Sequence, residues 1–252
     1  MTYFSMGYWI IGLSIAVSLV GALVGFSCIQ QSTKSVTSKF RVVWQASAAI
    51  SIGGMGVWLP VFVSMLGVAV PGSLVRYDVW SVAAAGVVSV LAVWVALVLA
   101  GRTLNIARLI GAGVVMGGGF GLMHFLALDA MHIQGSTELQ PALFVGAVAI
   151  AIVISLATLW FTQPRRPLVL LVGAALVFAA AIAGMHYTDL VGLRITLAKA
   201  NSTPPGEDLF GFFVPAFVLG MLSLAIPISA ILIAPDRRLS IPTRVPAPNS
   251  AF

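Results

Sequence analysis

Two methionine–histidine pairs are the residues of this chain best suited to chemistry. Met123-His124 and Met185-His186 stand 62 residues apart, each near the end of a long apolar run. An ionisable side chain inside hydrocarbon is costly and by default indicates a functional site. Imidazole nitrogen and thioether sulfur form a soft, neutral ligand set that suits copper(I), whereas zinc is less favoured because no cysteine or carboxylate cluster joins them. The two pairs therefore predict a metal site.

A third copy of the pattern is expected one interval further upstream. There the chain reads Pro60-Val61-Phe62-Val63-Ser64-Met65, which keeps an aromatic residue and a methionine but has valine where the histidine is expected. We therefore predict that one copper is bound by two histidines with assistance from thioethers. The predicted donors are His124, His186, Met123, Met185 and Met65. The alternative is that the methionines only fill gaps in the core and that the histidines make interhelical hydrogen bonds.

Composition places these residues in a membrane protein. The chain is 60% hydrophobic and only 8% charged, whereas a soluble domain carries about 25% charged residues. Stretches long enough to cross about 30 Å of hydrocarbon predict an all-α fold with seven transmembrane helices. These stretches lie near 8–30, 42–70, 79–100, 109–133, 141–163, 168–196 and 211–234. We expect residues 1–235 to form the transmembrane domain and 236–252 a short cytoplasmic tail.

The basic residues predict the orientation of the chain. Ten of the 13 lysines and arginines fall in the connections on one side of the predicted spans and in the tail, and such loops face the cytoplasm. The N-terminus is therefore predicted outside and the C-terminus inside, in the bacterial inner membrane. The net charge of +6 then favours anionic lipid headgroups, and no nucleic-acid motif accompanies it.

The spacing of the motifs predicts internal repeats. The second, fourth and sixth spans cross in the same direction, so each repeat is a two-helix unit of about 62 residues, and three parallel units plus one extra helix make seven spans. Parallel repeats are related by an axis along the membrane normal. We expect the three motif helices to face each other around that axis, with the motifs in the outer halves of the spans.

The chain resembles the MHYT-domain family of bacterial membrane sensors, through Met185-His186-Tyr187-Thr188, Met123-His124-Phe125 and the lead-in Gly56-Val57-Trp58. The resemblance implies a signalling protein that binds copper through methionine and histidine and senses oxygen, carbon monoxide or nitric oxide. It also implies an output through cyclic-di-GMP enzymes or a histidine kinase. The chain departs from the family motif at Leu128 and Leu190, where a second methionine is expected.

Several functions compete with the copper sensor. The leading alternative is a b-type haem protein with His124 and His186 as axial ligands. A metal-free, degenerate scaffold comes next, and a transporter ranks lower because the aspartates lie toward the outer boundary. We expect no enzyme activity in residues 1–252 and an output through a partner protein in the membrane or cytoplasm.

The residues around the motifs carry weaker predictions. Asp129 and Asp189 are expected to mark the membrane interface, with hydrogen bonding to a histidine as the alternative. Tyr187 and Phe125 either shield the site or belong to an interfacial aromatic belt. Pro60 is expected to kink the second span.

Overall fold

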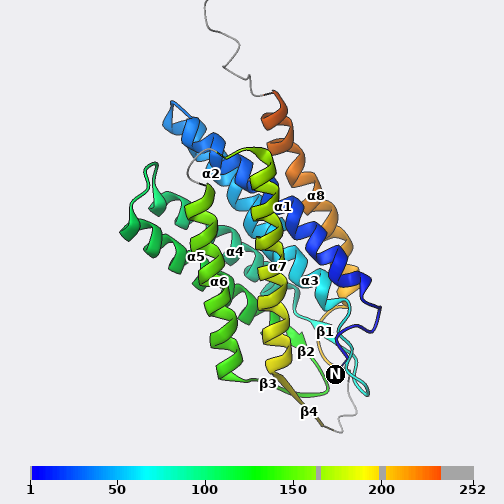
Figure 1. Cartoon of the computed structure of the whole chain (residues 1–252). Coiled ribbons are helices and arrows are strands. Elements are labelled where there is room, and N and C mark those ends of the chain that lie inside the picture. Colours follow the sequence, from blue (N-terminus) through cyan, green and yellow to red (C-terminus); the bar gives the residue numbers. More distant parts are fainter. Residues whose placement is uncertain (1, 163–165, 199–202, 234–252) are drawn as a thin grey trace, which may run out of the picture.

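Seven apolar helical spans dominate the computed structural model, which describes residues 2–162, 166–198 and 203–233 (Figure 1). In chain order they are α1 (Trp9–Lys34), a composite second span, α4 (Val79–Ala100), α5 (Ile106–Asp129), α6 (Pro141–Thr162), α7 (Leu168–Gly192) and α8 (Leu209–Ile233). The predicted all-α membrane fold with seven spans is confirmed. The orientation stays a prediction, and the predicted tail 236–252 lies outside the described residues.

The length of the spans fits a bilayer. Even the shortest, such as α4 with 22 residues, is about 33 Å long at 1.5 Å per residue, which exceeds the hydrocarbon thickness. Polar residues set where two of them begin. The carboxylate of Asp78 accepts a hydrogen bond from the Ser81 backbone N–H, and the Asn105 side chain accepts one from the Arg108 N–H, so both helices start with an N-cap.

The second span is continuous but changes its winding. It consists of α2 (Ser38–Ala49), a π-helical segment η1 (Ile50–Trp58) and α3 (Leu59–Met65). The Leu59 N–H bonds to the Gly54 carbonyl five residues back. Pro60 follows and has no N–H for the Gly56 carbonyl. The predicted disturbance at Pro60 thus takes the form of π-helical turns that end just before it.

Serines on neighbouring helices hydrogen-bond the carbonyls of this distorted segment. Ser18 on α1 donates to Gly56 O at 2.6 Å, and Ser89 on α4 donates to Gly53 O at 2.8 Å. A buried carbonyl without a partner is costly in a membrane, so these hydroxyls stabilise the unusual winding. They also hold the second span between α1 and α4.

Six spans form a closed ring and the seventh lies outside it. Consecutive spans pack against each other from α1 to α7, and α7 packs back against α1. The spans that carry the motif, namely the second span, α5 and α7, alternate around this ring with α1, α4 and α6. The extra helix α8 packs against α1, η1 and α3 (Figure 1). The second span is the most buried, with 83% of its apolar window inside the protein, against 17% for α8.

Two short antiparallel ladders join the ends of the three motif helices. Strand β1 (Arg76–Tyr77) pairs with β2 (Met131–His132), and β3 (Gly135–Leu139) pairs with β4 (Leu193–Leu197). All four strands lie at the same end of the bundle as the N-terminus (Figure 1); we call this the strand end. The predicted helices 109–133 and 168–196 were too long, because their last residues belong to β2 and β4.

Candidate metal site

The two histidines of the motif meet inside the bundle. His124 lies about 7.5 Å before the end of α5 and His186 about 9 Å before the end of α7, from the rise of 1.5 Å per residue. Nε2 of His124 and Nδ1 of His186 are 2.8 Å apart, a hydrogen bond between side chains that are 0% and 1% exposed. The predicted convergence of the fourth and sixth spans at this depth therefore holds for these two residues.

Asp189 is the third polar residue at this point. Its Oδ2 lies 2.8 Å from Nδ1 of His124, and its side chain is 1% exposed. The carboxylate lies off the line of the ring N–H, so the contact is a close electrostatic one rather than an aligned hydrogen bond. The expectation that Asp189 marks the membrane interface is not what the structure shows. Three residues after His186 on α7, it shares that helix face, and this spacing is the signal that reveals it in the sequence.

Several polar atoms of this group have no hydrogen-bond partner. They are Nδ1 of His124, Nε2 of His186 and both carboxylate oxygens of Asp189. Buried polar atoms are nearly always paired, so each exception calls for an explanation such as an ion or a water molecule. The cluster therefore has unused capacity for a ligand.

The three methionines of the predicted site are also buried. Met123 and Met185 are 0% exposed and Met65 is 1% exposed, and all three belong to the main core cluster. Within the described part of the chain, no three histidine, cysteine or carboxylate side chains converge as a ready-made metal site. A metal at this place would therefore depend on thioether sulfur as well as imidazole nitrogen.

Aromatic rings lie on two sides of the histidine pair. Toward the middle of the bundle, Phe120 on α5 and Phe178 on α7 are 6.5 Å apart between ring centroids. Toward the strand end, the Tyr187 ring is 5.1 Å from that of His186 and 5.5 Å from that of Phe4. The N-terminal segment that carries Phe4 is held by hydrogen bonds from Ser5 N and Oγ to Gly67 O. Tyr187 thus packs against His186 on the strand-end side, and Phe120 lies one helical turn before His124 on α5.

Other residues considered from the sequence lie away from the pair. Asp129 is exposed at the end of α5, as expected for an interfacial residue. Phe125 is 42% exposed and its ring packs on Phe144, 6.1 Å away. His132 is in β2, where Nδ1 contacts the Pro205 carbonyl oxygen at 3.2 Å. Of the two aromatic candidates for shielding, only Tyr187 contacts a histidine of the pair.

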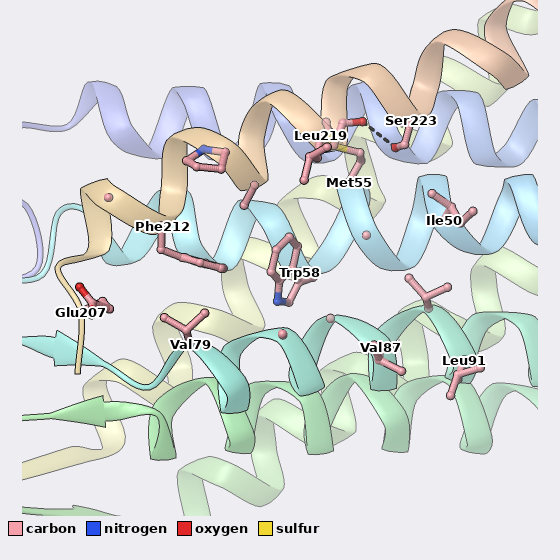
Figure 2. A pocket seen from close by; sticks show the side chains of 18 residues that line it. Ile50, Met55, Trp58, Val79, Val87, Leu91, Glu207, Phe212, Leu219 and Ser223 are labelled. Atoms are coloured by element: carbon pink, nitrogen blue, oxygen red, sulfur yellow. Dashed lines mark hydrogen bonds between the residues drawn. The ribbon is translucent and has the colours of Figure 1, made fainter. Parts of the chain in front are cut away.

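A separate cavity of about 870 Å³ lies between η1, α4 and α8 (Figure 2). Its walls are mostly apolar, with Glu207 at one end and Ile50 and Leu91 toward the other. The indole N–H of Trp58 donates to Val82 O and the hydroxyl of Ser223 to Gly220 O, so these polar groups are already satisfied. Neither histidine of the pair lines this cavity, so it is not part of the metal site.

The family comparison agrees with the repeat pattern. A family model described as "Bacterial signalling protein N terminal repeat" (MHYT) matches at residues 54–113 and again at 117–177. The chain belongs to the MHYT family. The two MHYT matches begin 63 residues apart, which aligns Val61 of the first repeat with His124 of the second. The tetrapeptide Met185-His186-Tyr187-Thr188 lies after the second match, near the end of the third motif helix, α7.

Curated relatives of this MHYT protein are larger signalling proteins. It is 27% identical over 249 residues to the bifunctional diguanylate cyclase/cyclic di-GMP phosphodiesterase MucR of Pseudomonas aeruginosa, covering 94% of this chain and 36% of the relative. It is 28% identical to the cyclic di-GMP phosphodiesterase NbdA of the same species, covering 76% of this chain and 24% of NbdA. It is 26% identical to the signalling protein YkoW of Bacillus subtilis, covering 79% of this chain and 25% of YkoW. The chain thus spans 24–36% of the length of these relatives, and no solved structure matches it.

Proposed function

We propose that this MHYT protein is a multi-pass membrane sensor that binds one copper(I) at the pair His124 and His186. The bound copper would bind a diatomic gas, which the protein would thereby sense. Oxygen, carbon monoxide and nitric oxide are the gases that such a metal binds. Met123, Met185 and Met65 are the proposed thioether donors. The observation that carries the proposal is the buried histidine pair with its unpartnered Nε2 on His186.

The donor chemistry supports copper(I) over harder metals. Thioether and imidazole are soft or intermediate ligands, which copper(I) accepts, whereas calcium, magnesium and manganese require several oxygens. The histidine pair has a single carboxylate beside it, and each of the three motif helices carries a buried methionine. When bound, copper would supply the redox and gas-binding chemistry that these side chains lack, and the protein would hold it away from water.

The haem alternative finds less support. Axial histidines lie on opposite faces of a porphyrin, and two imidazoles in direct contact at 2.8 Å leave no space for a porphyrin between them. Haem would require α5 and α7 to separate. A metal-free scaffold remains the competing proposal, since the two histidines satisfy one hydrogen bond between themselves.

The proposed output is a cyclic-di-GMP signal delivered through a partner rather than catalysis by the helices. The relatives MucR and NbdA are named for making or degrading cyclic di-GMP, and this chain aligns with 36% or less of either. With the predicted N-out, C-in orientation, the strand end and the metal site face the outside of the cell. A change at the histidine pair would then reach the cytoplasm through the helices.

Metal analysis of the purified protein tests the proposal. Wild type loaded with copper(I) and desalted is expected to retain about one copper per chain, and the double variant His124→Ala, His186→Ala none. His132→Ala is the matched control, because this third histidine lies outside the site and its variant is expected to retain copper. Equal copper in wild type and the double variant, or none in wild type, would refute the proposal.

A further inference from the structure

We infer that Asp189, His124 and His186 act in series and present one atom, Nε2 of His186, as the imidazole ligand. In this arrangement His124 does not bind the metal directly, and Asp189 and His124 are positioning residues. The inference rests on the proposed copper site and refines it. It starts from the two contacts of 2.8 Å that join the three side chains.

The distance between the histidines argues against two direct ligands. Two nitrogens that each bind one metal at about 2.0–2.1 Å are about 3.3 Å apart at a tetrahedral angle and about 4 Å apart in a linear arrangement. The facing nitrogens here are 2.8 Å apart, which is a hydrogen-bond distance. Nε2 of His124 and Nδ1 of His186 are thus engaged with each other.

The carboxylate fixes the direction of that hydrogen bond. Although Oδ2 of Asp189 lies off the N–H line, its negative charge at 2.8 Å repels a lone pair on Nδ1 of His124 and attracts a proton there, so the proton is held on Nδ1. Neutral His124 then has its lone pair on Nε2, which accepts the proton of His186 Nδ1. This leaves a lone pair on Nε2 of His186, which is buried without a hydrogen-bond partner. A carboxylate behind a ligating histidine is a recurrent way to fix its tautomer.

Asp189 also matches the charge of the ion. A buried carboxylate without a balancing cation is costly. Among the described residues, Asp189 pairs with His124 and with no lysine or arginine. One monovalent copper ion brings the cluster to neutrality, since the thioethers and neutral imidazoles carry no charge. The series therefore favours a monocation over a divalent ion.

Single variants distinguish this series from a symmetric pair of ligands. His186→Ala is expected to lose copper(I), while His124→Ala and Asp189→Asn retain it with affinity reduced about 10–100-fold, the usual effect of losing a supporting partner. His124→Gln is expected to bind more tightly than His124→Ala, because its amide oxygen can still accept the His186 proton. Affinity is measured by competition with a chromophoric copper(I) chelator. Complete loss of copper in both His124 variants, or unchanged affinity in Asp189→Asn, would overturn the inference.

Nitrogen NMR of the metal-free protein provides a readout that does not depend on copper or on a variant that folds. In wild type labelled with ¹⁵N in histidine, we expect the His186 proton on Nδ1 and a coupling through the hydrogen bond to Nε2 of His124. A proton on Nε2 of His186 would mean that the bond runs the other way and would overturn the inference. If wild type shows the expected tautomer but binds no copper, the proposed function fails while the series stands.

Discussion

Three consecutive glycines on α5 allow a matched test of how the ring is packed. A Cβ added to Gly117 would lie 2.4 Å from Cα and 2.5 Å from N of Ile152 on α6, whereas a Cβ added to Gly118 meets nothing within 4 Å. Ordinary contacts of this kind are about 1 Å longer, so Gly117→Ala must push α5 and α6 apart. The obstacle is backbone and cannot rotate away.

The two variants share the same gain in helix propensity, roughly 0.5–1 kcal/mol for glycine to alanine. Gly117→Ala adds an overpacking cost of about 1–3 kcal/mol, which Gly118→Ala lacks. We therefore expect Gly117→Ala to be about 1–3 kcal/mol less stable than Gly118→Ala. Unfolding in detergent micelles by SDS titration, followed by circular dichroism, measures the difference. If Gly117→Ala proves as stable as Gly118→Ala, the close packing of α5 on α6 is wrong.

Two further predictions concern single polar groups. Ser18→Ala removes the hydrogen bond to the Gly56 carbonyl and is expected to lower the free energy of unfolding by about 0.6–1.7 kcal/mol. The control is Ser27→Ala, which loses only a hydrogen bond to a carbonyl of its own helix. Equal losses of stability in the two variants would contradict the account of the π-helical segment. Hydrogen bonds from the Ser81 hydroxyl and backbone lower the pKa of Asp78, so its contribution to stability is complete above its unfolded pKa of about 4 and is lost as pH falls through the lower folded pKa. Thermal unfolding of Asp78→Asn should accordingly depend less on acid pH than that of wild type, and identical acid profiles would refute this.

Much of the fold follows from the sequence because it depends on local properties. The length of each apolar stretch sets the number of spans, and the interval between the motifs sets which spans share a direction. The closed order of the ring and the meeting of His124 with His186 agree with that reasoning. The predicted spans fail at their ends, where strands β2 and β4 replace the last helical turn, because ladder pairing depends on residues far away in the chain.

Part of the site could not be predicted because it depends on helix rotation. Asp189 lies within one turn of the end of α7, where a carboxylate usually faces the headgroups, but the face it shares with His186 points inward. The π-helical winding of η1 is equally hidden, because it is stabilised by Ser18 and Ser89 on other helices. In both cases the deciding contact joins residues at least 36 positions apart. The three-residue spacing predicts that Asp189 shares a helix face with His186, but it does not predict that this face points inward.

The first repeat has a different role from the other two. At the position that aligns with His124, α3 carries the buried Val61, and the next residue, Phe62, has its ring centroid 6.2 Å from that of Phe212 on α8. Trp58, one turn earlier, also lies 6.2 Å from Phe212. The motif position of the first repeat is thus apolar, and the aromatic rings beside it contact the extra helix. We therefore expect the second and third repeats to supply the histidines of the metal site, and the first to supply only the thioether of Met65 and to join the ring to α8.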